Sequence, residues 1–189
     1  SNGILRDALT VLVNLRHRGA CGCEPNTGDG AGVLFQTPHA FLRAVCAEQG
    51  IDLPAAGAYG AGMLYLPRHP EQRRACEARV EETVREFGQV VLGWRTVPTD
   101  DRSLGATAVS GEPVVRQLFI GRGAGLPGDE MAFERKLYVI RQVAEHTIRN
   151  STLPGRESFY IPSLSHRTIV YKGMLTSQQH QEFYPELLG

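Results

Sequence analysis

Helical and strand patterns alternate along this chain and end in two adjacent strand patterns, which restricts the chain to folds that contain both helices and strands. Apolar residues at helical spacing predict helices over 4–15, 70–87 and 129–150. Apolar or β-branched runs bounded by glycine or proline predict the strands, which are residues 32–36, 60–66, 89–97, 114–120, 158–164 and 168–174. Because only a short turn near His166 separates the last two runs, we expect them to pair with each other. The order predicts an α+β fold with a mixed sheet and packed helices.

Cap residues predict where the shorter helices begin and end. Thr37 followed by Pro38 is typical of an N-cap and a first helical residue, and Gly50 predicts the end of that helix. Thr176 predicts the cap of a short final helix. Because the sequence contains no repeat, low-complexity tract or linker, we expect one domain or most of one.

The charge balance narrows the range of partners. Twenty basic residues balance twenty acidic ones in this chain of 189 residues, so the formal net charge is zero. Proteins that bind nucleic acid or a membrane surface usually carry a basic excess. The first residues, SNGILRDAL, lack the basic start and apolar core of a signal peptide. We therefore expect a cytoplasmic protein with reduced cysteines that binds neither nucleic acid nor membrane.

Two glycine-rich runs raise nucleotide binding as an alternative. Residues 28–32 lead directly into a strand, which is the reverse of the strand–glycine–helix order of a dinucleotide-binding turn. Residues 121–125 do follow a strand and precede a helix, but the third glycine of the motif is replaced by Leu126. A small nucleotide-binding domain that uses residues 121–125 is therefore the less favoured alternative function.

The cysteines raise metal binding and nucleophilic catalysis as further alternatives. His17, Cys21 and Cys23 offer three ligands, whereas a tetrahedral zinc site needs a fourth. Cys46 and Cys76 lie within helical patterns and are predicted to be core positions. A nucleophilic cysteine needs a base or a helix N-terminus that lowers its pKa, and the sequence places neither beside them. We therefore predict no metal site and no catalytic cysteine within the chain.

Two strings far apart in the chain resemble segments of one family. Residues 14–38, NLRHRGACGCEPNTGDGAGVLFQTP, are similar to the HRGA…TGDGAG segment of glutamate synthase large subunits. Residues 159–175, FYIPSLSHRTIVYKGML, are similar to the SLSxRTIVYKGML segment of the same family. The two strings occur in the family's order. The resemblance covers essentially all of the chain after Ser1 and Asn2, which we interpret as expression-tag residues.

The resemblance implies a class II glutamine amidotransferase domain with the N-terminal-nucleophile hydrolase fold, an αββα sandwich of two antiparallel sheets between helices. It implies that an N-terminal cysteine thiolate attacks the side-chain amide of glutamine, with its own α-amino group as the base. The released ammonia would convert 2-oxoglutarate to glutamate in a separate flavin domain of the parent. The implied cofactors of the parent are FMN, an iron–sulfur cluster and NAD(P)H or ferredoxin as electron source, and none of them is expected within this fragment.

The chain departs from the family pattern at both ends. The family's Cys-Gly-Val-Gly-Phe start should precede Gly3, and its HSRFSTNT and HNGE-type segments should follow Gly189. We therefore expect residues 3–189 to be a partial domain that lacks the nucleophile and is inactive by itself. The residues that match the family's pattern are predicted to support the active site rather than to catalyse: Arg18, Gly19, Asp29, Ala31, Gly32 and Lys172.

The resemblance also suggests partners. Glutamine is the implied substrate, and other domains of the same polypeptide and a glutamate synthase small subunit are the implied protein partners. If sheet strands are missing, unpaired edges remain, so we also expect a homo-oligomer that forms through exposed sheet edges. The alternative is a non-catalytic binding or interaction module that keeps the amidotransferase fold.

Overall fold

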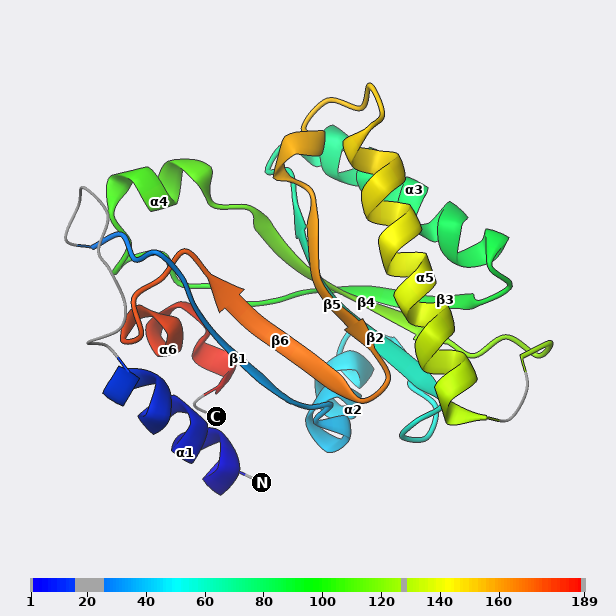
Figure 1. The fold of residues 1–189 in the computed structure, drawn as a ribbon, viewed down its shortest axis with the longest axis horizontal. Coiled ribbons are helices and arrows are strands. Elements are labelled where there is room, and N and C mark those ends of the chain that lie inside the picture. The colour runs from blue at the N-terminus through cyan, green and yellow to red at the C-terminus, as the bar shows by residue number, and fades with distance from the viewer. Residues whose placement is uncertain (1, 16–25, 127–128, 188–189) are drawn as a thin grey trace. The chain divides into compact units, whose positions relative to one another are not determined.

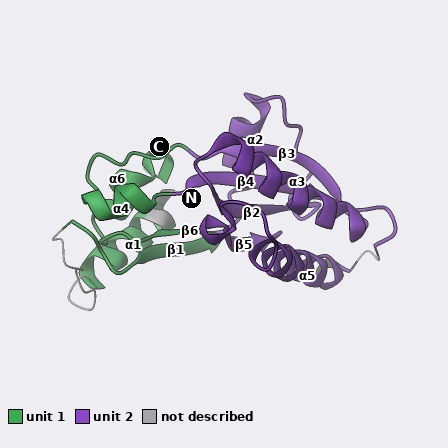
Figure 2. Cartoon of the chain, turned by 90° about the horizontal axis from the view of Figure 1, so that it is seen from above, with its two compact units in different colours: residues 1–35, 98–112, 170–189 green, residues 36–97, 113–169 purple. Residues whose placement is uncertain are grey.

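The computed structural model describes residues 2–15, 26–126 and 129–187 (Figure 1). The chain divides into two compact units, each assembled from segments that are far apart in sequence (Figure 2). The first unit comprises Ser1–Phe35, Pro98–Glu112 and Val170–Gly189, and the second comprises Gln36–Val97 and Pro113–Ile169.

The second unit is built on a four-stranded antiparallel sheet in the order β3-β4-β2-β5. Its strands are β2 (Tyr59–Leu66), β3 (Val90–Thr96), β4 (Val114–Gly121) and β5 (Tyr160–Ser165). Helix α3 (Pro70–Glu86) connects β2 to β3, and helix α5 (Glu130–Arg149) connects β4 to β5. This β-α-β-β-α-β order with the first strand in the interior of the sheet is the split β-α-β arrangement.

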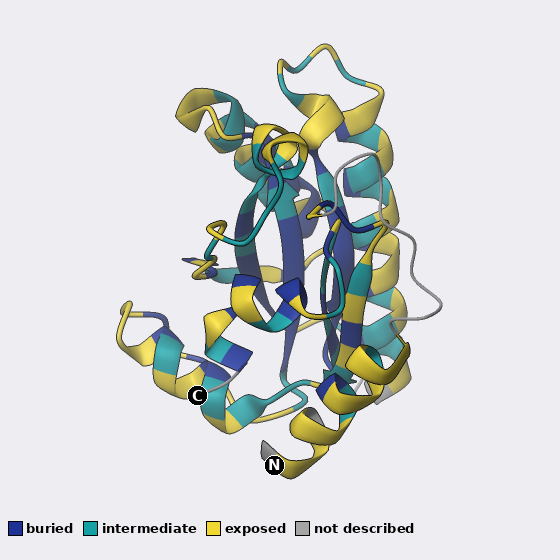
Figure 3. Cartoon of the chain, turned by 90° about the vertical axis from the view of Figure 1, so that its left-hand side faces the viewer, coloured by how far each residue is buried: buried dark blue, intermediate teal, exposed yellow. Residues whose placement is uncertain are grey.

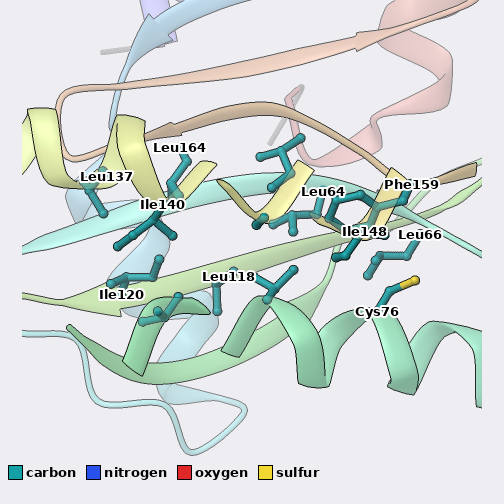
Figure 4. Packing of buried hydrophobic residues seen from close by; sticks show 14 of the residues in the cluster. Leu64, Leu66, Cys76, Leu118, Ile120, Leu137, Ile140, Ile148, Phe159 and Leu164 are labelled. Carbon is teal, nitrogen blue, oxygen red and sulfur yellow. The ribbon is translucent and has the colours of Figure 1, made fainter. Parts of the chain in front are cut away.

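Helices α3 and α5 bury the main hydrophobic core of this unit against the sheet. Apolar residues recur every three or four positions along α5 and are fully buried: Phe133, Leu137, Ile140, Ala144 and Ile148. Leu64 and Leu66 of β2 lie in the same cluster, and Figure 4 shows side chains from the helices and the strands interleaved. Burying one such leucine or isoleucine contributes about 1.5–3 kcal/mol, so this cluster is the chief source of the unit's stability.

The alternate residues of β2 are buried in a second, smaller set of contacts. Because side chains alternate along a strand, Tyr59 and Met63 cannot share a face with Leu64 and Leu66. Both are nonetheless almost fully buried. Tyr59 contacts helix α2 (His39–Ala47), since its hydroxyl lies 3.2 Å from the imidazole Nδ1 of His39.

The first unit contains helices α1 (Asn2–Asn14), α4 (Ala106–Gly111) and α6 (Gln179–Phe183), together with a two-stranded sheet. The sheet consists of β1 (Ala31–Gln36) and β6 (Thr168–Gly173). The last residue of β1 and the first two residues of β6 belong to the second unit. Of the described side chains of α1, only Leu9 is buried, and Figure 3 shows the exposed residues of this helix. Single 3-10 turns, η2 (Arg156–Ser158) and η3 (Pro185–Leu187), complete the described elements.

The structure corrects two predictions about the sheet. We expected residues 158–164 and 168–174 to pair as a hairpin, but β5 pairs with β2 and β6 pairs with β1. The hydroxyl of Ser165 accepts hydrogen bonds from the backbone N–H groups of Arg167 and Thr168, which stabilises a tight turn directly after β5. The prediction of a mixed sheet was also wrong, because every pairing within the four-stranded sheet is antiparallel.

Neither of the two predicted N-cap residues is the N-cap of its helix. Thr37 is not the N-cap of α2, because that position is Pro38 and carries no side-chain cap. The N-cap position of α6 is Gln178, without a side-chain cap, so the predicted cap at Thr176 lies two residues too early. Thr176 instead stabilises the turn that leads into α6: its hydroxyl accepts the N–H of Gln179 at 3.3 Å, and Gln179 Oε1 accepts the N–H of Thr176 at 2.8 Å. This reciprocal pair has the hydrogen bonds of a capping box. Within the described ranges, no helix has the length and apolarity to cross a membrane.

Candidate functional site

Parts of the two strings that carry the family resemblance pair with each other as β1 and β6, and we call this pair the β1–β6 ribbon (Figure 1). A Cβ atom added at Gly32 would lie 2.6 Å from the Cβ of Lys172, and one added at Gly28 would overlap the backbone of Leu175. Because positions 28 and 32 face positions 175 and 172, the strands run antiparallel. The TGDGAG segment therefore needs glycine where two backbones approach closely.

The ribbon brings four of the predicted site residues together. Asp29 and Ala31 alternate with the glycines that touch β6, and Asp29 is exposed whereas Ala31 is half-buried. Lys172 is half-buried on the opposite strand, and its backbone carbonyl accepts a hydrogen bond from the Tyr184 hydroxyl at 2.8 Å. Arg18 and Gly19, like His17, Cys21 and Cys23, lie outside the described residues.

Gln179 ties three segments of the first unit together through one buried amide. Its Nε2 donates to the carbonyls of Asn26 at 2.8 Å and Ser103 at 2.7 Å, while its Oε1 accepts the N–H of Thr176. The residue is 6% exposed, so loss of the amide would remove a hydrogen bond from each of three part-buried backbone groups. Because Asn26 lies just before Gly28, this amide anchors the start of the glycine-rich segment. The T-x-x-Q spacing from Thr176 is the sequence signal for their reciprocal pair.

An aromatic cluster supports the other side of the ribbon. Tyr171 of β6 stacks on Phe35 of β1 with ring centroids 5.5 Å apart, and it meets Tyr184 edge-on at 5.1 Å. The Tyr171 hydroxyl donates to Glu186 at 2.6 Å. His180 is fully buried, and its Nε2 lies 2.9 Å from the Tyr171 carbonyl oxygen. Because a carbonyl oxygen can only accept, Nε2–H is the donor of this hydrogen bond. Burial lowers the pKa of His180, so the neutral imidazole is the form that fits this site.

The two cysteines within the described residues are not suited to nucleophilic catalysis. Cys46 and Cys76 are both fully buried, as predicted for core positions, and neither forms a disulfide. Burial raises the pKa of each thiol to about 11, which keeps it protonated at neutral pH. Since the thiolate is the reactive form, these residues act as small apolar core side chains.

The glycine run at residues 121–125 has a packing role. A Cβ atom at Gly123 would overlap the carbonyl of Gly88, and the Gly123 N–H donates to the Gln89 side chain at 3.0 Å. The following helix, α5, is capped by its own Asp129, whose carboxylate accepts the N–H of Met131 at 2.9 Å. A carboxylate at this position would repel a phosphate. These contacts account for the run without a nucleotide.

Metal binding finds no support in the part of the chain that the structure describes. No group of three or more histidine, cysteine, aspartate or glutamate side chains there is arranged to hold a metal ion. The candidate ligand set of His17, Cys21 and Cys23 falls in the range 16–25, outside the described residues.

The sequence comparisons agree with the two matched strings. Residues 1–189 match the family described as glutamine amidotransferases class-II over their whole length. The chain is 44% identical over 187 residues to the glutamate synthase [NADPH] large chain of Bacillus subtilis, and 36% identical over 184 residues to the ferredoxin-dependent glutamate synthase 2 of Synechocystis. These alignments cover 99% and 97% of this chain.

The chain spans only 12% and 11% of the length of those two relatives. Among solved structures, the C-terminal domain of the MgtC protein from Mycobacterium tuberculosis aligns with a TM-score of 0.30 and 13% identity, over 66% of this chain and 97% of that one. No common fold follows from a likeness at that level. The whole-length family match decides the assignment: the chain belongs to the class II glutamine amidotransferases.

Proposed function

We propose that this chain is part of the glutaminase region of a glutamate synthase and serves the release of ammonia from the side-chain amide of glutamine. The observation that carries the proposal is the β1–β6 ribbon, in which residues 31–36 of one string shared with that family pair with residues 168–173 of the other. The identity of 44% to a glutamate synthase large chain over 99% of this chain supports it. Ammonia released here would be consumed by 2-oxoglutarate elsewhere in the parent enzyme, to give glutamate.

The nucleophile of this reaction would be the N-terminal cysteine that the family resemblance implies, with its α-amino group as the base. Cys46 and Cys76 are unsuited because they are buried and protonated, and Cys21 and Cys23 have acylated backbone nitrogens. We therefore propose that the 189 residues alone do not hydrolyse glutamine. FMN, an iron–sulfur cluster and NAD(P)H or ferredoxin would serve the later reduction in other parts of the parent.

The residues matched to the family pattern would support the glutaminase site rather than react with glutamine. Gly32 permits the close approach of β1 to β6. Lys172 lies in β6, and Asp29 lies two residues before β1. We assign Ala31 to the same supporting set, and we extend the assignment to Arg18 and Gly19 on the family pattern alone. We further propose that the parent domain has the αββα sandwich fold that the family resemblance implies.

Exposed apolar side chains support contacts with other parts of the parent. Leu34 of β1 is 64% exposed and Met174, which follows β6, is 66% exposed. On α1, Ile4 is 70% exposed. A two-stranded sheet leaves both of its outer edges open, which favours pairing with further strands. We propose that other domains of the same cytoplasmic polypeptide cover these surfaces, with a second copy or a small subunit as the competing occupants.

An isotope experiment on the parent enzyme tests this function. With glutamine labelled with ¹⁵N at the side-chain amide, and with 2-oxoglutarate and reductant present, the label is expected in the amino group of glutamate. Without 2-oxoglutarate, labelled ammonia is expected in solution, whereas asparagine should release none. A folded parent that releases no labelled ammonia would overturn the proposal and favour a non-catalytic module.

A further inference from the structure

Helices α3 and α5 lie side by side on one face of the four-stranded sheet, but their outward faces differ in chemistry (Figure 1). On α3, acidic and basic side chains are interspersed along the exposed positions, which are Pro70, Glu71, Arg74, Ala78, Glu82, Arg85 and Glu86. Arg85 pairs with Glu81 one turn earlier at 2.6 Å, and Arg79 pairs with Glu82. A surface that neutralises itself in this way is typical of a helix that faces water.

The exposed positions of α5 include no acidic residue among the side chains that the structure describes. They are Met131, Arg135, Tyr138, Val139, Gln142, His146 and Arg149. Spacings of three and four residues place them along one side of the helix. We call this set the α5 stripe.

The two described carboxylates of α5 are engaged at the sheet instead. Glu145 Oε1 accepts the backbone N–H of Ile161 at 2.9 Å, and Glu134 Oε2 accepts the backbone N–H of His166 at 3.1 Å. Both glutamates thus satisfy backbone groups in and directly after β5. Their charges do not lie on the α5 stripe.

Three apolar side chains of the α5 stripe are open to solvent. Tyr138 is 59% exposed, Met131 is 46% exposed and Val139 is 39% exposed. The outward side of a helix that covers a sheet is usually polar, so these side chains indicate a surface that another protein segment covers. Tyr, Met and Arg are enriched in protein–protein interfaces, whereas Asp, Glu and Lys are depleted there.

Cations accompany these apolar side chains along the whole α5 stripe. Arg149 lies in the last turn of α5, and at the other end the Arg167 guanidinium lies 4.0 Å from the Met131 sulfur. Arg135 pairs with the exposed carboxylate of Asp129 at 3.3 Å. Among these described residues, three arginines accompany one carboxylate, so the surface is positively charged and fits an acidic partner.

We propose that the α5 stripe docks on an acidic surface of another part of the parent polypeptide, with Tyr138 as the apolar anchor and carboxylates opposite Arg135 and Arg149. This inference rests on the proposed function, because it takes the chain to be one part of a longer enzyme. The chain spans only 12% of the length of its Bacillus subtilis relative, so most of such a parent is available to supply the partner surface.

The charges disfavour two other occupants of the α5 stripe. Two copies of the stripe would place arginine against arginine, which opposes a dimer through this face. An anionic lipid surface is usually bound by clusters of about four or more basic residues, more than the stripe and Arg167 supply.

Zero-length crosslinking of the parent enzyme tests the contact, because a carbodiimide joins a lysine amine to a carboxylate only where the two touch. Lys136 and Lys172 are the only lysines of the chain, so an added lysine gives a distinct product. Arg149→Lys keeps the cation, and we expect its amine to be linked to an aspartate or glutamate outside residues 1–189. Arg74→Lys, on the outward face of α3, is the matched control and should form no such link. An Arg149→Lys enzyme without that link, or linked only to a second copy of residues 1–189, would overturn the proposal.

Charge reversal gives an independent readout of the same contact. In the parent, Arg135→Glu/Arg149→Glu should make hydroxyl-radical oxidation of Tyr138 several-fold faster, because the face separates from its acidic partner. Arg74→Glu/Arg85→Glu makes the same change on α3 and should leave that rate unaltered. Unchanged oxidation of the buried Phe133 shows that α5 stays packed. Equal oxidation of Tyr138 in the two double variants would overturn the proposal.

Docking of α5 and glutamine hydrolysis are tested separately. A parent that releases labelled ammonia but forms no link from position 149 contradicts the docking alone. A parent that forms the link but releases no labelled ammonia contradicts the proposed function alone. Cosedimentation with phosphatidylglycerol vesicles that is lost in Arg135→Glu/Arg149→Glu would assign the α5 stripe to a lipid surface and overturn the docking.

Discussion

Gly32 and Lys172 oppose each other across the β1–β6 ribbon so closely that a Cβ atom on Gly32 would lie 2.6 Å from the Cβ of Lys172. Real Cβ atoms do not approach a neighbour this closely, so a side chain at position 32 would force the strands apart. The contact joins the two segments that the chain shares with glutamate synthases. The glycine pattern of the first segment thus follows from the position of the second.

Gly32→Ala is expected to destabilise the chain by about 1–3 kcal/mol, the usual cost of overpacking a closely packed contact. Gly28→Ala should cost at least as much, because its Cβ would overlap the backbone of Leu175, which cannot change rotamer. Urea unfolding gives the free energy of unfolding of each variant. Gly125→Ala is the matched control, since its Cβ would meet nothing within 4 Å. Stability equal to the control for both variants would contradict the close approach.

Gln179→Met removes the amide that joins Asn26, Ser103 and Thr176 but keeps the length of the side chain. We expect a loss of about 1–2 kcal/mol, because the part-buried carbonyls of Asn26 and Ser103 each lose a donor and a buried side chain loses its hydrogen bonds. Hydrogen exchange should also become faster at the N–H of Gly105, which donates to the Asn26 carbonyl. The neighbouring exposed Gln178→Met should alter neither quantity, and protection of Gly105 in Gln179→Met equal to that control would refute the anchoring role.

The pH dependence of stability should report His180. Burial lowers its pKa below the ordinary value, so the unfolded chain binds this proton more readily than the folded one. The contribution to stability is fully present above the unfolded pKa near 6.5 and is lost as the pH falls below it, by at most about 1.4 kcal/mol per pH unit. Urea unfolding between pH 7 and 5 measures this slope.

His180→Gln should flatten that slope, whatever its effect on the absolute stability. His69→Asn, at an exposed position, should leave the slope as it is in the unmodified chain. If His180→Gln does not reduce the slope of the free energy of unfolding against pH, the proton that causes this slope binds to another group.

Cys46 and Cys76 should resist alkylation in the folded chain. Both thiols are buried, and their pKa values of about 11 leave little thiolate at pH 8. Iodoacetamide followed by peptide mass spectrometry is expected to label both residues only after urea is added. In the parent enzyme, Cys46→Ala and Cys76→Ala should keep the glutaminase rate of the unmodified enzyme. Loss of that rate in a folded variant would reopen the question of the nucleophile.

Local patterns in the sequence were sufficient for most elements and for the core of the second unit. Helix α5 was predictable because its apolar residues repeat every three or four positions, and Cys46 and Cys76 were correctly predicted to be buried. The pairing of β5 was missed, because its partner β2 is distant in sequence and no local signal encodes that choice. The short helix α4 was also missed, since six residues show no helical period.

The sequence named the residues of the candidate site, whose role there stays a prediction, but it did not give their arrangement. The sequence singled out Asp29, Gly32 and Lys172 through the resemblance, while the close approach of Gly32 to Lys172 across two strands is a tertiary contact. Thr176 was predicted as a cap and instead stabilises the turn before α6, while the bonds from Gln179 to Asn26 and Ser103 depend on where the fold places those carbonyls.

The central claim is that the β1–β6 ribbon supports glutamine hydrolysis in the parent enzyme. The most direct test compares glutamate formation driven by glutamine with that driven by added ammonia, in Asp29→Asn and Lys172→Met variants of the parent. Exposed Asp101→Asn serves as the matched control. We predict that kcat/KM for glutamine falls about tenfold or more, as expected when a catalytic group is misplaced, while the ammonia-driven rate is unchanged. Equal losses in both rates, or no loss in either, would contradict the claim.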